Sequence, residues 1–308
     1  MEVVKDWSRA LIYTGQSLKG EDIVKYTAQL REVDPNVLEY NIADAEWVSG
    51  LPIADYLVSP DEIFNNNATL QMVVHTLNVT ASDLIRRKMV TTEGLVAAGH
   101  SLGEVAALDI AKVFPTRAAS MEFVFARGSG MQRAYIQNPG SLYMLLGLSE
   151  VQAGTLPAEL GTVPALINAP ELTVVAADKG RLAVIEAEVK KIGAKRVQDL
   201  EIPPFHTNRM LQAQADLEAF SRQREFGTAI FPVVSNYDGE AGLDGYELIV
   251  KHITSVTNPV RWVDVIATIK HPGVTFYTMG PGNNPAALNT LNGVPKEQTK
   301  DLFQLLAG

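Results

Sequence analysis

A serine lies between two glycines at residues 99–103, and its surroundings favour a nucleophile. An apolar run at 95–98 precedes this Gly-His-Ser-Leu-Gly segment, and an Ala-rich helical pattern follows it. A buried strand, a sharp turn with serine and a helix form the nucleophile elbow of serine enzymes. Ser101 would then lie at a helix N-terminus, where free N–H groups and the helix dipole stabilise a developing anion. The alternative is a structural helix cap, because serine is a favoured N-cap residue.

Arg127 and His206 are two further candidates for chemistry. Arg127 lies in a mostly apolar run at 123–128, where a charge is costly unless it has a partner. It would either form a buried ion pair or receive a carboxylate, a task that suits the forked guanidinium. His206 follows two prolines at 203–204, which stiffen the loop ahead of a helical pattern. This position suits a general base, although most single histidines are structural or exposed.

The elements that must position these residues alternate between strands and helices. Residues 10–13 form an apolar run that predicts a buried strand, and a Gly-Gln turn follows it at Gly15 and Gln16. Such a turn can bring a side-chain amide to an active site, although a plain turn is the alternative. The segment 37–67 shows only short helical pieces. Helices are expected at 20–34, 70–88, 116–136 and 207–224, further strands at 229–234 and 274–279, and the final helix near Asn284. This alternation predicts an α/β core with a mainly parallel sheet.

Residues 139–202 show a different order of predicted strands and helices. Their order is βαββαβ, with strands at 142–148, 163–168, 172–176 and 195–200 and helices at 149–160 and 178–192. This is the order of a ferredoxin-like unit. We therefore expect a core built from residues 1–138 and 203–308, with 139–202 as an inserted small subdomain. A simple extension of the main sheet is the alternative.

Composition excludes several classes of protein. The 308 residues are 46% hydrophobic and 20% charged, as in an ordinary globular protein of one large domain or one domain with an insert. A net charge of −9 and a pI near 5.1 argue against a nucleic-acid partner. The absence of cysteine excludes disulfides, cysteine–metal sites and thiol catalysis. Residues 1–8 hold no signal sequence, and no apolar run is long enough to span a membrane, so a cytoplasmic protein is expected.

A serine esterase or thioesterase of the α/β-hydrolase type is one function to consider. That fold places the acid and then the histidine after the serine, with a His-Gly-Gly-Gly type oxyanion loop before it. This chain has no such loop. After Ser101 the available bases are His206, His252 and His271, and an esterase would favour one of the last two.

A second family accounts for more of the sequence. Its landmarks are Gly-His-Ser-Leu-Gly-Glu at 99–104, Phe-Ala-Arg-Gly at 125–128 with Met131-Gln132, Phe205-His206, Pro-Val-Val-Ser-Asn at 232–236, Asn-Pro-Val-Arg-Trp at 258–262 and Gly-Pro-Gly at 280–282. With these ordered motifs the chain resembles the malonyl-CoA:acyl-carrier-protein transacylases, and the related acyltransferase domains of fatty acid and polyketide synthases, over nearly its whole length. One departure is the first loop, usually Gly-Gln-Gly-Ser-Gln, which here is Gly-Gln-Ser-Leu-Lys at 15–19.

The resemblance implies a hydrolase-like core with an inserted ferredoxin-like subdomain, and ping-pong acyl transfer. His206 would take the proton of Ser101, which attacks the acyl-CoA thioester. Backbone N–H groups of Leu102 and Gln16 would hold the oxyanion. A main-chain carbonyl near Ser255 would orient the histidine, so no third acid is required.

The resemblance also implies the substrate. The family's arginine, here Arg127, binds the free carboxylate of malonyl, so malonyl-CoA is the expected substrate. Phe205 and His100 would line the acyl pocket, and Phe205 and Leu102 resemble malonyl-selective members. The reaction would need no metal and no bound cofactor. The fatty acid or polyketide pathway stays open, whereas an inactive docking module is disfavoured because Ser101, His206 and Arg127 are all present.

The expected partner is an acyl carrier protein, which is acidic, as is this chain. Docking would therefore need a local basic patch. Candidates are Lys190, Lys191, Lys195 and Arg196, together with the cations at 86–88, although ordinary solvated charge is the alternative. We expect a monomer, and the Met1 start with the full family length favours a discrete protein.

Overall fold

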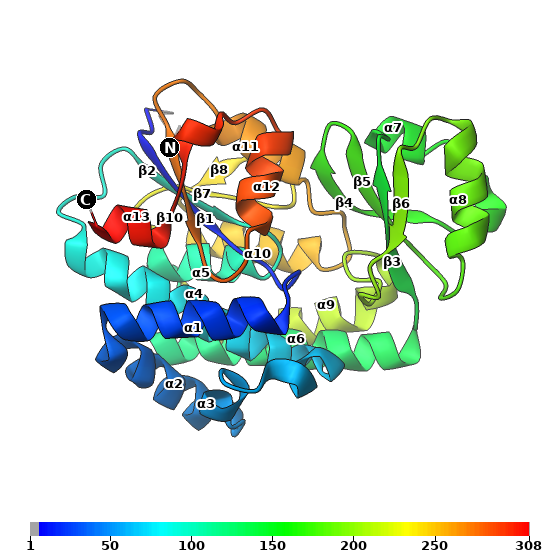
Figure 1. Cartoon of the computed structure of the whole chain (residues 1–308). Coiled ribbons are helices and arrows are strands. Elements are labelled where there is room, and N and C mark those ends of the chain that lie inside the picture. Colours follow the sequence, from blue (N-terminus) through cyan, green and yellow to red (C-terminus); the bar gives the residue numbers. More distant parts are fainter. Residues whose placement is uncertain (1–5, 308) are drawn as a thin grey trace.

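The computed structural model describes residues 6–307 and contains two sheets of different size (Figure 1). The larger has six strands in the order β10-β9-β1-β2-β7-β8, parallel except for the last pair. Its strands are β1 (Arg9–Tyr13), β2 (Leu95–Gly99), β7 (Val233–Val234), β8 (Ala241–Gly242), β9 (Thr275–Met279) and β10 (Thr299–Asp301). Because parallel strands share a direction, the loops after β1 and β2 meet at one edge of the sheet. Ser101 lies in the second of these loops.

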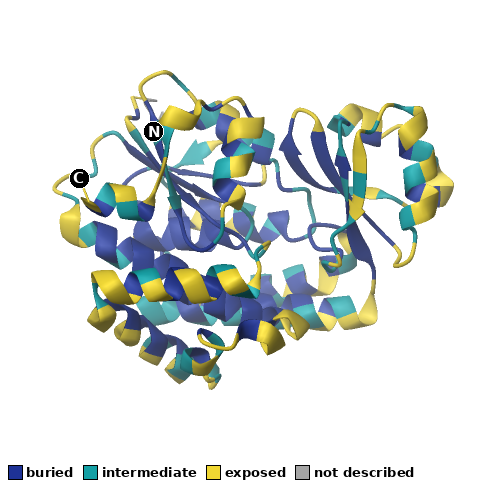
Figure 2. Cartoon of the chain, viewed as in Figure 1, coloured by how far each residue is buried: buried dark blue, intermediate teal, exposed yellow. Residues whose placement is uncertain are grey.

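Helices cover both faces of this sheet, and alternate residues of β1 enter two separate cores. Leu11 and Tyr13 pack into the larger core, whereas Ala10 and Ile12 pack into the smaller one. The larger core is built on α1 (Gly20–Val33), α2 (Pro35–Ser49), α4 (Asn67–Lys88), α5 (Gly103–Ile110), α6 (Arg117–Gln137), α9 (Leu211–Ser221) and α10 (Gly245–Ser255). The smaller core contains α11 (Trp262–Ile269) and is closed by α12 (Asn284–Leu291). Figure 2 shows the central strands β1 and β2 as buried, whereas the edge strand β10 is mostly exposed.

The second sheet is antiparallel and lies beside the first (Figure 1). Its order is β4-β5-β3-β6, from β3 (Ser141–Leu146), β4 (Val163–Ala169), β5 (Leu172–Ala177) and β6 (Arg196–Asp199). The helices α7 (Glu150–Ala153) and α8 (Leu182–Lys191) pack on one face, against Tyr143 and Val175. The opposite face, with Val174 and Leu166, joins the core around α11. The small sheet therefore forms a wall beside the main sheet.

Short elements complete the chain. They are α3 (Ile53–Tyr56), α13 (Leu302–Ala307) and the 3-10 turns η1 (Pro60–Asn65), η2 (Ala158–Leu160), η3 (Asn208–Met210) and η4 (Lys296–Gln298). Within residues 6–307 no helix combines the length and apolarity needed to cross a membrane.

The structure confirms an α/β fold with a mainly parallel sheet and corrects several expected elements. The short helical pieces expected at 37–67 are confirmed as the greater part of α2 followed by α3 and η1, and α2 starts with the side chain of Asp34 as its cap and Pro35 in its first turn. The expected strand at 229–234 is limited to β7, because the Ala229 N–H bonds to Leu243 rather than to a neighbouring strand. The helix near Asn284 is not the final one, since β10 and α13 follow it.

Candidate active site

Ser101 forms a sharp turn between β2 and α5. Its φ of 52° lies in the left-handed region, a strained conformation that is concentrated at functional sites. The flanking glycines make the turn possible by close packing. A Cβ on Gly99 would lie 2.0 Å from the carbonyl carbon of Gly103, and one on Gly103 would lie 2.4 Å from the Tyr13 oxygen. Both positions therefore require glycine, which explains the Gly-x-Ser-x-Gly pattern.

His206 is in position to accept the proton of Ser101. Its Nε2 lies 2.7 Å from Ser101 Oγ, and its Nδ1 lies 2.7 Å from the main-chain oxygen of Ser255. Because a carbonyl can only accept, Nδ1 carries the proton and Nε2 presents its lone pair to the hydroxyl. His206 is buried and its φ of 60° is also left-handed, so both members of the pair are held in unusual backbone conformations.

Burial lowers the pKa of His206 from 6.5 to about 3, and the nearby Arg127 cation acts in the same direction. The ring is therefore neutral, as a base must be, well below pH 6.5. We expect the rate of covalent loading of Ser101 to stay level from about pH 8 down to pH 6 and to fall only in more acidic solution. Single-turnover rates measured across this range provide the test. An acid limb centred at or above pH 6.5 would contradict it.

Arg127 reaches the same serine from α6. It is buried, with Nη2 3.1 Å from Ser101 Oγ and Nη1 2.8 Å from Oε1 of Gln71. No carboxylate forms an ion pair with it in the part of the chain that the structure describes, so the buried ion pair considered from sequence is absent there. Burial lowers the pKa of Arg127 to about 10, which still leaves it cationic at neutral pH. A desolvated cation thus lies beside the nucleophile without a carboxylate in ion-pair contact among the described residues, and Glu104 acts on its charge only from farther away.

Two backbone N–H groups are available near Ser101. The Ser101 N–H is engaged, since it donates to Asn236 Oδ1 at 2.7 Å. The N–H groups of Leu102 and Gln16 have no acceptor among residues 6–307. Leu102 precedes α5 directly, where the helix dipole favours an anion. Gln16 lies in the loop after β1, which approaches the elbow so closely that a Cβ on Gly15 would lie 2.7 Å from the His100 oxygen.

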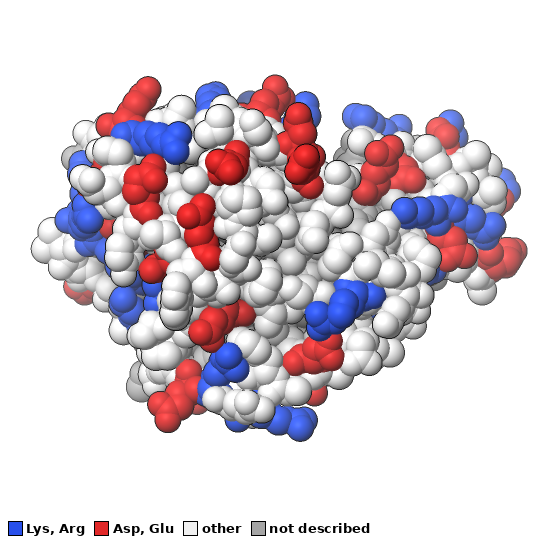
Figure 3. All heavy atoms as spheres, turned by 90° about the horizontal axis from the view of Figure 1, so that it is seen from below, with Lys and Arg blue, Asp and Glu red and all other residues white. Residues whose placement is uncertain are grey.

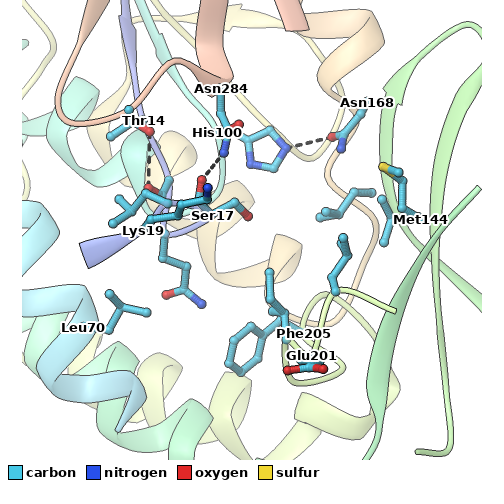
Figure 4. Close-up of a pocket in the computed structure, with 18 of the residues that line it drawn as sticks. Thr14, Ser17, Lys19, Leu70, His100, Met144, Asn168, Glu201, Phe205 and Asn284 are labelled. Atoms are coloured by element: carbon cyan, nitrogen blue, oxygen red, sulfur yellow. Dashed lines mark hydrogen bonds between the residues drawn. The ribbon is translucent and has the colours of Figure 1, made fainter. Parts of the chain in front are cut away.

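A cavity of about 780 Å³ lies between the two sheets and α12. His100 and Phe205, the chain neighbours of Ser101 and His206, line it together with Gln16 (Figure 4). His100 is fixed by Nε2, 2.8 Å from Oδ1 of Asn168. Apolar side chains of the small sheet and of α12 form much of the remaining wall: Met144, Leu166, Leu172, Val174, Leu288 and Leu291. The catalytic candidates therefore lie next to a cavity that is large enough for a small ligand.

The histidines that an esterase would favour do not reach Ser101. His252 is buried and its Nδ1 lies 2.7 Å from Oε2 of Glu104. His271 accepts a hydrogen bond from the Gly273 N–H. Among the described residues, the late histidine that the esterase alternative requires is therefore not in contact with Ser101.

Four contributors to the site are not among the residues to which the family resemblance gives a role. They are Gln71, which orients Arg127, and the connected set Glu104, Asn236 and His252. Glu104 and Asn236 lie inside recognised motifs, so a signal was present for these two. Gln71 is one of many polar residues in the helix α4, and nothing in its local sequence distinguishes it.

The expected carrier-binding cations lie on and beside α8. Lys190 pairs with Glu186, Lys191 with Glu188 and Lys195 with Glu171. Arg196 donates to Gln198. The neighbouring carboxylates weaken the positive potential that this group can offer. The face in Figure 3 likewise shows acidic and basic side chains interspersed, without a continuous basic patch.

The comparisons with known proteins agree with this geometry. No protein-family model matches the chain. A malonyl CoA-acyl carrier protein transacylase of Haemophilus influenzae is 29% identical over 301 residues, which cover 95% of this chain and 93% of that protein. An acyl carrier protein S-malonyltransferase from Vibrio cholerae is 26% identical, with a TM-score of 0.83 over 96% of this chain and 95% of that chain. A malonyl-transacylase in complex with a type II PKS acyl-carrier protein is also 26% identical, with a TM-score of 0.84 over 97% and 99%.

Sequence and fold therefore agree over nearly the entire length, and the resemblance that the motifs indicated is confirmed. The chain is thus similar, over nearly its whole length, to malonyl-CoA:acyl-carrier-protein transacylases.

Proposed function

We propose that this protein transfers a malonyl group from malonyl-CoA to the phosphopantetheine thiol of an acyl carrier protein. The observation that carries the proposal is Arg127, a buried cation that forms no ion pair within residues 6–307 and whose Nη2 is 3.1 Å from the Ser101 hydroxyl. An acyl group with a free carboxylate would supply the missing anion while its carbonyl faces the serine. Malonyl has this structure, and relatives across nearly the whole chain are named for malonyl transfer.

The contacts support a two-step reaction. His206 Nε2 takes the proton of Ser101 as Oγ attacks the thioester carbonyl, and the Leu102 and Gln16 N–H groups hold the oxyanion. The carbon–sulfur bond then breaks, CoA leaves with the proton from His206, and malonyl remains as an ester on Ser101. The carrier thiol gives its proton to His206 and attacks this ester. The Ser101 oxygen leaves with that proton, which restores the enzyme.

We also propose a subdomain division, a monomeric state, a substrate and a partner for this protein. The strand order β4-β5-β3-β6 and the βαββαβ sequence support a ferredoxin-like subdomain at 139–202, and the elbow supports a hydrolase-like core at 1–138 and 203–308. All proposed catalytic groups come from one chain, so a monomer suffices. The proposed steps use malonyl-CoA as substrate and no bound cofactor. A solved relative is bound to an acyl-carrier protein, which supports that partner here.

Brief incubation with malonyl-CoA followed by intact-mass measurement tests the function. We expect a malonyl adduct that disappears when a phosphopantetheinylated carrier protein is added and reappears on the carrier. Acetyl-CoA, which lacks the free carboxylate, is the matched control and should load far more slowly. Steady hydrolysis of simple esters without an adduct would support the esterase instead.

A further inference from the structure

Glu104 is a buried carboxylate that the proposed steps do not use. It lies in the first turn of α5 and is fully buried. Its Oε1 accepts the Asn236 N–H at 3.0 Å, and its Oε2 lies 2.7 Å from Nδ1 of His252. No lysine or arginine forms an ion pair with it within residues 6–307. Burying a carboxylate costs several kcal/mol, so the hydrogen bonds at this position require an explanation.

One branch of these contacts leads to the nucleophile. Asn236, whose main-chain N–H binds Glu104, accepts the Ser101 N–H through Oδ1 at 2.7 Å. Its Nδ2 donates to the Gly99 oxygen at 2.8 Å. The amide therefore holds the strand end and the serine backbone together. Because Ser101 is in the left-handed region, it needs surrounding contacts to maintain its conformation.

The other branch leads to the base. His252 belongs to α10, and its main-chain oxygen accepts the hydroxyl of Ser255 at 2.7 Å. The main-chain oxygen of Ser255 in turn accepts the Nδ1 proton of His206 at 2.7 Å. The contact between Glu104 and the His252 ring thus holds the end of α10 against α5. The end of α10 orients His206, and α5 directly follows Ser101.

We propose that Glu104 is a positioning residue for acyl transfer, which acts through Asn236 on Ser101 and through His252 on His206. This inference rests on the proposed malonyl transfer. Glu104 connects the segments of Ser101 and His206, which are 105 residues apart in sequence. Their reacting atoms must stay within hydrogen-bond distance. Small displacements of such atoms reduce rates strongly, because the reaction depends on their alignment.

The test compares Glu104→Ala and Glu104→Gln with a matched buried carboxylate on the same helix. Asp109 pairs with Arg117 and Arg86, away from Ser101, so Asp109→Ala serves as the control. Rapid-quench intact mass gives the rate of malonyl loading and the fraction of molecules loaded. We expect Glu104→Ala to load completely but about 100-fold more slowly, with the KM for malonyl-CoA changed less than about 3-fold. Glu104→Gln should recover to within about 10-fold, because an amide can still bind Asn236.

The rate and the fraction loaded separate positioning from folding. A purely structural role would leave fewer active molecules that load at the wild-type rate, as expected for Asp109→Ala, and this result for Glu104→Ala would overturn the inference. If Glu104→Ala does not fold, His252→Leu removes the second branch and is judged by the same two quantities. Absence of loading in the wild-type protein would instead refute the proposed function, so the two failures are distinguishable.

Discussion

Replacement of Ser101 by alanine is expected to abolish the malonyl adduct and to lower transfer to the carrier protein by at least about 1,000-fold. His206 and Arg127 both contact the Ser101 Oγ atom, and alanine removes this atom without adding volume. Intact mass after brief exposure to malonyl-CoA measures the adduct directly. Steady-state transfer gives the residual rate, which the oxyanion donors alone would support.

The chain contains a second buried serine–histidine pair that serves as a control. Ser120 Oγ lies 3.2 Å from Nε2 of His75, a contact similar to that of Ser101 with His206. Both residues are fully buried within helices, and the Ser120 hydroxyl donates to the Arg117 oxygen. Ser120→Ala should therefore load malonyl normally. An adduct that persists in Ser101→Ala at the wild-type rate would show that another residue is the nucleophile.

The difference between these two pairs illustrates what sequence can predict. The elbow at Ser101 is visible because glycines, an apolar strand and a helix adjoin it in sequence. Its contacts with Arg127 and His206 span 26 and 105 residues, and only the family resemblance indicated them. Glu104 lies in a recognised motif, but its proposed positioning role depends on α10, a helix that the sequence pattern did not reveal.

The ion pairs of the lysines on α8, in contrast, could be predicted from the sequence. Lys190 and Lys191 are candidates for a basic patch, yet Glu186 and Glu188 lie about one helical turn earlier in the sequence. Side chains three or four residues apart on a helix are neighbours, so these ion pairs were predictable from spacing alone. Carrier docking through α8 is therefore less favoured than the lysine count suggested.

Replacement of Arg127 by alanine is expected to reduce malonyl loading and to remove the preference for malonyl over acetyl. Truncating one partner of a buried charge pair costs about 2–4 kcal/mol, which corresponds to roughly 30- to 1,000-fold in kcat/KM. Acetyl has no carboxylate, so in the wild-type protein it would leave the buried guanidinium without an ion-pair partner. Acetyl loading should therefore stay level or rise in the variant. Single-turnover loading with each CoA ester measures both rates.

The ratio of the two rates separates recognition from a general defect. Arg127 also binds Gln71, so its loss leaves Oε1 of that amide without this donor and could disturb the site. A general disturbance would slow malonyl and acetyl loading equally, whereas loss of a carboxylate receptor slows malonyl alone. Arg127→Lys adds a graded case, because it keeps the charge but loses the fork that contacts both Ser101 and Gln71. Equal losses for the two esters in Arg127→Ala would exclude Arg127 as the residue that selects malonyl.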